Sequence, residues 1–100
     1  MTIQQFIESH NSANPQERRQ ALNYFFGVQD TLMYMNDWMR YEGYGEHVCF
    51  PSPIPDRETM YMEYIGYLGE VAGHIGWEKL SRQHVDQVLW ASWRIRYECD

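Results

Sequence analysis

The fold is decided by one stretch of the chain, Asn14 to Met39, which reads NPQERRQALNYFFGVQDTLMYMNDWM. Its first residues form a helix start. The side chain of Asn14 can accept hydrogen bonds from the N–H groups of the first turn, and Pro15 needs no N–H at the first helical position. Glu17, three residues after Asn14, can reach back to close a capping box. A helix is therefore predicted to begin at Pro15.

An apolar stripe runs along this predicted helix. Its members recur at steps of four and three residues, which places them on one face: Ala21, Phe25, Val28, Leu32, Met35 and Met39. The helix would be roughly 26 residues, or about 39 Å, long. The stripe is predicted to be the seam of the core. Gly27 lies inside it, where glycine costs about 1 kcal/mol relative to alanine. The expected compensation is a second helix that packs closely against Gly27.

Length and charge limit the classes of function. With 100 residues, the chain is predicted to form a single domain, residues 1–100. The formal net charge is -6 and the only lysine is Lys79, so nucleic acid is not an expected partner. No run of about 18 apolar residues is present, so no membrane partner is expected, and residues 1–5 do not resemble a signal peptide. Met1 is expected to be either a native cytoplasmic start or the residue in place of a removed signal.

Shorter segments flank the long helix. Thr2 can cap a first helix whose Ile3, Phe6 and Ile7 share a face, and this face is predicted to lie against the apolar stripe. The long helix is predicted to end near Arg40. The loop that follows, residues 41–47, contains two glycines. Prolines at three alternate positions in residues 49–55 then predict a stiff, extended connector.

A third helix is predicted after Asp56, its N-cap. Its apolar face comprises Tyr61, Tyr64, Leu68, Val71 and Ile75, widened by Met60, Ile65 and Tyr67. Gly66, Gly69 and Gly73 weaken this helix, and their missing side chains are expected to admit Phe25 and Phe26 of the long helix.

A final helix is predicted after a turn at Trp77 to Leu80, with Ser81 as its cap. Its apolar face comprises Val85, Val88, Leu89, Ser92 and Ile95. Trp90, Trp93 and Tyr97 cannot all share that face, so some of them are expected to cover another part of the core or a partner subunit. The chain is therefore predicted to be all-α, a small bundle of four main helices with a proline-rich connector.

No arrangement of residues predicts catalysis, and no catalytic residue, metal site or cofactor is expected. His47 and Cys49 come nearest to a thiol–imidazole pair or half a metal site, but no second cluster of cysteine and histidine stands at a usable spacing. A thiol hydrolase is the enzymatic alternative. His74 and His84 flank a predicted turn, and we expect both to be solvent-exposed or capping residues.

The two cysteines, Cys49 and Cys99, leave two possibilities open. They can form one disulfide, which would contribute about 4 kcal/mol by the chain-entropy model. They can also be free thiols in a reducing cytoplasm. A disulfide would tie the last helix to the proline-rich connector.

Several short motifs occur in an order that resembles a known family. They are Tyr24-x-x-Gly27-Val28-x-Asp30-x-Leu32, Cys49-x-Pro51, Tyr67-Leu68 and an apolar helix that closes at Cys99. Together they cover about 80 residues and are similar to the type VI secretion amidase immunity family, also called Rap/Tai proteins. Members are small helical proteins, usually periplasmic and often dimeric, that block a peptidoglycan-cleaving amidase.

The resemblance implies an inhibitor rather than an enzyme, with a cognate amidase effector as partner, a periplasmic location and a homodimer. It also implies which cysteines pair. The family has two further cysteines where this chain has His10 and Ala21, so one disulfide is absent as a unit and Cys49 pairs with Cys99. Asn23 also stands where the family has glycine, and residues after Pro51 are proline-rich rather than glycine-rich. The alternative function is a cytoplasmic inhibitor or interaction protein, for example from a mobile element, that blocks another macromolecule.

An inhibitor of this kind would insert an irregular segment into the cleft of its target and use a few aromatic anchors. Two segments are candidates: the loop that the prolines hold and the turn at residues 73–79 with its tryptophan. The predicted partner-binding residues are Tyr41, Tyr44, Glu46, His47, His74, Trp77 and Glu78.

Overall fold

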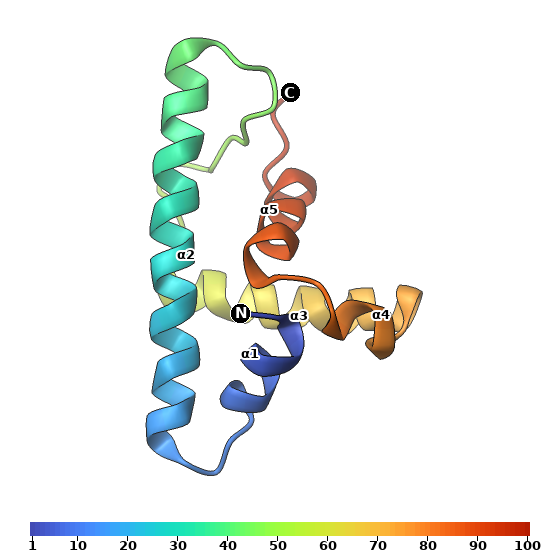
Figure 1. Cartoon of the computed structure of the whole chain (residues 1–100). Helices are drawn as coiled ribbons and strands as arrows, with labels where there is room; N and C mark the ends of the chain where they lie inside the picture. The colour runs from blue at the N-terminus through green and yellow to red at the C-terminus, as the bar shows by residue number, and fades with distance from the viewer.

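One long helix organises the molecule. The computed structural model describes all residues 1–100 and contains α1 (Ile3–His10), α2 (Pro15–Glu42), α3 (Arg57–Ile75), α4 (Trp77–Ser81) and α5 (Val85–Arg96). Figure 1 shows α2 upright at the left, with α1 and α5 beside it and α3 running across it toward α4. The all-α fold and its four main helices are confirmed, and α4 is a fifth helix of only 5 residues.

The first three helices begin at the predicted caps. The side-chain oxygens of Thr2, Asn14 and Asp56 each accept a hydrogen bond from a backbone N–H in the first turn. The Asn14 oxygen accepts from the N–H of Gln16 at 2.9 Å rather than from that of Glu17. The predicted capping box at the start of α2 is therefore not formed.

Two helix boundaries differ from those predicted. Helix α2 continues past Arg40 and ends at Glu42. Gly43 is its C-cap residue, and its left-handed φ of 82° suits glycine. The predicted turn at residues 77–80 is the short helix α4. Ser81 is not the cap of the last helix, because it is the last residue of α4 and α5 begins later, with His84 at its N-cap position. The Ser81 hydroxyl instead donates to the carbonyl of Glu78 at 2.8 Å.

Aromatic side chains make the centre of the core. Phe25 of α2 is fully buried, and its ring lies 5.1 Å from that of Tyr61, 5.2 Å from that of Tyr64 and 6.5 Å from that of Phe6. The hydroxyl of Tyr64 donates to the carbonyl of Val85 at 3.0 Å. Helices α1, α2, α3 and α5 therefore meet around Phe25, and the predicted contact of α1 with the long helix is confirmed.

The predicted seam of α2 is confirmed as buried only for its first two residues. Ala21 and Phe25 are buried, but Met35 is 49% exposed and the other members, Val28, Leu32 and Met39, are half-buried. The buried face instead continues through Gln29 and Asn36. At 3.6 residues per turn, this face is rotated by roughly 50° from the predicted stripe. Part of the apolar stripe is therefore left at the surface.

The expected close helix packing at the glycines is wrong. A Cβ atom added at any of four positions, Gly27, Gly66, Gly69 and Gly73, would have no neighbouring atom within 4 Å. The rings of Phe25, Tyr61 and Tyr64 lie between α2 and α3, and such large side chains hold two helix backbones apart.

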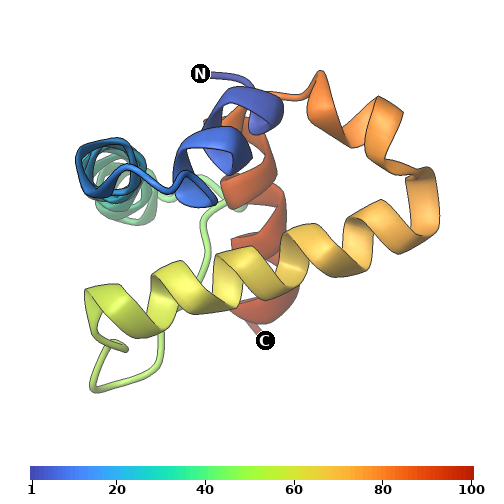
Figure 2. The same ribbon diagram turned by 90° about the horizontal axis from the view of Figure 1, so that it is seen from below.

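The apolar faces of α3 and α5 are shorter than predicted. Val85, Val88, Leu89 and Ser92 are buried as expected, but Ile95 is 69% exposed, because Trp93 and Tyr97 occupy the core side of the last turn. On α3 the buried stripe stops at Leu68, and Ile75 is 45% exposed. Figure 2 shows why, since the end of α3 and α4 project to the right, away from α2.

Candidate functional site

A disulfide joins the connector to the end of the chain. Cys49 and Cys99 are bonded, with their Cα atoms 5.1 Å apart and a sequence separation of 50. The pairing that the resemblance implied is therefore present. While the bond is intact, neither sulfur is a thiolate. Neither can therefore act as the nucleophile that the thiol-hydrolase alternative requires, and neither can bind a metal as a thiolate.

Val48, next to this disulfide, is held by a buried asparagine of α2. Asn36 is fully buried, its Oδ1 accepts from the N–H of Val48 at 2.7 Å, and its Nδ2 donates to the Val48 carbonyl at 3.1 Å. The N–H of Cys49 then donates to the carbonyl of Tyr97 at 2.8 Å. Residues 48 and 49 are thus fixed to α2 on one side and to the end of α5 on the other.

Tyr97 connects the same region to α3. Its hydroxyl donates to Glu63 Oε2 at 2.6 Å, and Arg96 lies 3.5 Å from that oxygen. Burial, followed by the hydrogen bond and the negative charge of Glu63, raises the pKa of Tyr97, so the phenol stays protonated and keeps donating. The carboxylate of Glu63 is therefore engaged within the fold.

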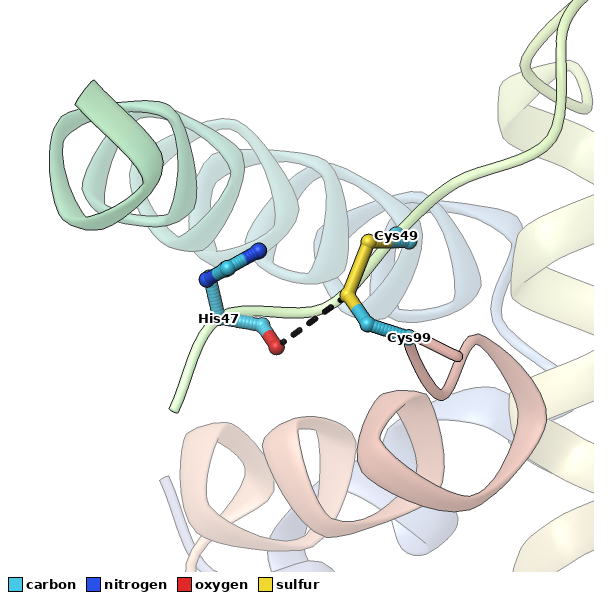
Figure 3. A group of neighbouring side chains, drawn as sticks. All are labelled: His47, Cys49 and Cys99. Atoms are coloured by element: carbon cyan, nitrogen blue, oxygen red, sulfur yellow. Dashed lines mark hydrogen bonds between the residues drawn. A yellow bond between two sulfur atoms is a disulfide. The ribbon is translucent and has the colours of Figure 1, made fainter. Parts of the chain in front are cut away.

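His47 lies beside the disulfide. Its Nδ1 is 2.7 Å from the carbonyl oxygen of Tyr44, and a carbonyl can only accept, so Nδ1 carries the proton and donates. Figure 3 shows the imidazole and the two joined sulfurs side by side, with Cys99 Sγ 3.7 Å from the His47 carbonyl oxygen. The sequence indicated the His47–Cys49 pair and, separately, a Cys49–Cys99 disulfide, but it did not predict that all three side chains lie together.

The first set of predicted partner-binding residues lies at one end of α2. Tyr41 is 88% exposed, and Tyr44 is 53% exposed with its ring 5.5 Å from that of Trp38. Glu46 is exposed and His47 is half-buried. This loop is at the upper end of the long helix in Figure 1. The exposed rings of Tyr41 and Tyr44 offer aromatic surface to solvent there.

The second set lies at another extremity. His74 is exposed in the last turn of α3, and Trp77 at the start of α4 is 45% exposed. Glu78 forms an exposed ion pair with Arg82 at 2.8 Å. Because α3 and α4 project away from α2, the structure does not bring the two predicted sets together.

A groove between α2 and the start of α5 was not predicted from the sequence. Its volume is about 620 Å³, and its lining residues are Met1, Asn23, Tyr24, Gly27, Val28, Thr31, Leu32, Met35, His84 and Asp86. A second hollow of about 190 Å³ shares Leu32 and Met35 and continues to Met39, Glu46 and Trp90. Together we call these two hollows the α2 groove. It runs from the middle of α2 toward the loop that contains Tyr44.

Comparison with known proteins gives no match. No family model, curated protein or solved structure is similar to this chain. None of the helices combines the length and apolar character needed to cross a lipid bilayer. The resemblance to the amidase immunity family therefore rests on the sequence motifs and stays a prediction.

Proposed function

We propose that this chain is a binding protein that inhibits a peptidoglycan amidase delivered by type VI secretion, and that the α2 groove is its main contact surface. The observation that carries the proposal is the position of the motif residues. Tyr24, Gly27, Val28 and Leu32, which carry much of the family resemblance, all line this groove. Val28 and Leu32 were expected to be core residues, yet they are only half-buried and also line this groove.

Gly27 is the most informative of them. In mid-helix it costs about 1 kcal/mol relative to alanine, and no neighbour in the molecule needs the space that its missing side chain leaves. A partner that approaches the helix backbone closely would account for glycine at this position. Further along α2, Met35 in the groove and Tyr34 and Trp38 outside its lining are 49%, 76% and 52% exposed, the kind of aromatic and methionine surface common in interface cores.

The groove also favours one of the two predicted segments. It reaches Met39 and Glu46, so a partner bound along α2 would also meet the loop at residues 41–47. Residues 74–78 lie on the projecting end of α3 and α4, outside this surface. We therefore assign target contact to the groove and to Tyr41 and Tyr44.

Two further parts of the proposal concern location and assembly. A periplasmic location is supported by the disulfide, since such bonds persist in oxidising compartments. The proposed homodimer would use exposed apolar residues at the end of α3 and on α5, Ile75 and Ile95, neither of which lines the groove. Light scattering at micromolar concentration is expected to give twice the mass of one chain, and a monomeric mass would contradict the dimer.

The proposed function is tested by capture and inhibition. The purified chain serves as bait for periplasmic and secreted proteins. The recovered protein is expected to be a peptidoglycan amidase, and an equimolar amount of the chain should inactivate it.

Gly27→Trp is expected to weaken binding at least about 30-fold, the loss typical of a central interface position. Tyr44→Ala should weaken binding, whereas Trp77→Ala should not.

Gly66→Trp is the matched control. Gly66 also lies in mid-helix with no neighbour within 4 Å of an added Cβ, but it is on α3. The control should fold and bind like the parent chain. Equal effects of the two tryptophan variants would reject the groove, and recovery of a cytoplasmic macromolecule would favour the alternative function.

A further inference from the structure

We propose that the chain binds one zinc ion when its disulfide is reduced, through the thiolates of Cys49 and Cys99 and the imidazole of His47. This site is independent of the proposed inhibitor function. In an oxidising compartment the two sulfurs form a disulfide crosslink, and in a reducing compartment they become metal ligands.

The three ligands are already gathered. A ring nitrogen of His47 and the two sulfurs all lie within 4.8 Å of one another (Figure 3). Zn–S bonds of about 2.3 Å and Zn–N bonds of about 2.0 Å in a tetrahedron place ligand atoms about 3.5–3.8 Å apart. Once the disulfide is cleaved, small side-chain movements are enough to reach that spacing.

A hydrogen bond determines which nitrogen of the His47 imidazole is free to bind zinc. Because Nδ1 donates to the Tyr44 carbonyl at 2.7 Å, Nε2 is the nitrogen left free, and in the neutral imidazole it carries the lone pair. A backbone carbonyl that accepts from the other ring nitrogen is the usual support of a metal-binding histidine, because it fixes the tautomer and the ring orientation. His47 has this support from the carbonyl of Tyr44.

The ligands stay near one another without the disulfide. Asn36 holds Val48 through two buried hydrogen bonds, and the N–H of Cys49 is bonded to the carbonyl of Tyr97. Tyr97 is only two residues before Cys99. The backbone on both sides of the site is therefore fixed by contacts that reduction does not remove.

The site has room for a fourth ligand. A cavity of about 180 Å³ lies beside His47 and Cys99, and it is also lined by Glu46, Glu98 and Arg94. Such a cavity admits water, which commonly takes the fourth position on zinc bound by three protein ligands. The two carboxylates and one guanidinium leave this cavity with a net negative character that suits a cation.

The chemistry balances with a dithiol as reductant. The dithiol transfers two electrons and two protons to the disulfide, so the Cys49–Cys99 bond breaks, two thiols form, and the dithiol becomes its own disulfide. Zinc then displaces both thiol protons to solvent. The two thiolates neutralise the charge of the ion, and His47 binds as neutral imidazole.

The test is a metal titration of the full chain. The protein is reduced with a phosphine, freed of it without air, and titrated with Zn²⁺ and with Co²⁺ as a spectroscopic probe. The reduced chain is expected to bind one equivalent, with a sulfur-to-cobalt charge-transfer band and the visible bands of tetrahedral cobalt. The oxidised chain should show neither band. Zinc should also raise the Tm of the reduced chain.

His47→Gln separates this site from binding by two thiols alone. Loss of a supporting residue typically weakens metal binding 10–100-fold, so loss of the His47 ligand is expected to cost at least about 100-fold. His74→Gln, an exposed histidine outside the cluster, is the matched control and should bind like the parent chain. Equal zinc affinity of the reduced parent and His47→Gln, or a reduced chain that stays unfolded with zinc, would overturn the proposal.

Discussion

Replacing both cysteines, as Cys49→Ser with Cys99→Ser, is expected to lower the free energy of unfolding by about 4 kcal/mol. The bond closes a loop across a sequence separation of 50 residues, and most of its effect is to restrict the unfolded chain. The folded state should change little, because Asn36 and the Cys49–Tyr97 hydrogen bond hold the same segment. Urea unfolding followed by circular dichroism measures the loss.

The reduced parent chain is the control for this variant. It opens the same bond without changing a side chain, so both proteins should lose similar free energy in the absence of metal. The m-value should rise in both, because an unfolded chain without a crosslink exposes more surface. A loss below about 1 kcal/mol would mean that the unfolded chain keeps these residues together without the bond.

Local signals in the sequence predicted the helices well. The caps at Thr2, Asn14 and Asp56 depend on side chains that bond within their own turn, so the surrounding fold does not alter them. The prolines of the connector act locally in the same way. The last helix start was missed because His84, at its N-cap position, makes no side-chain capping bond.

The rotation of α2 could not be predicted from hydrophobic spacing. Two stripes pass through Phe25, one continuing to Val28 and Leu32, the other to Gln29 and Asn36. The first is more apolar and was preferred. The second is buried because Asn36 finds both hydrogen-bond partners in Val48, a contact that depends on the path of the connector. The sequence signal for the second stripe was its pair of polar residues one heptad apart, Gln29 and Asn36.

The same rotation explains what was missed at the candidate site. The apolar residues Val28, Leu32 and Met35 were assigned to the core, so no groove was expected, although they line one. The cluster at His47 was missed for a different reason. The His47–Cys49 pair and the Cys49–Cys99 disulfide were considered as separate features, and the folded chain shows that their three side chains form one cluster.

Asn36→Ala is expected to lower the free energy of unfolding by about 4 kcal/mol, because it leaves two buried backbone groups of Val48 without partners at about 1–3 kcal/mol each. Val48 is only 1% exposed, so water cannot replace the lost amide while the segment stays in place. Chemical denaturation measures the loss, and hydrogen exchange should show weaker protection of the Val48 N–H. Asn23→Ala, an exposed asparagine of the same helix, should change stability by less than about 0.5 kcal/mol.

The effect of Asn36→Ala should depend on the disulfide. With the bond intact, residues 48 and 49 cannot leave the core, so the unpaired groups of Val48 remain buried. With the cysteines replaced, the segment can move into solvent, where water satisfies those groups. The triple variant should therefore lose less free energy than the sum of the two separate losses, by roughly 1–2 kcal/mol. Strict additivity would show that Asn36 and the disulfide act on different parts of the chain, and that the segment between them is not a single structural unit.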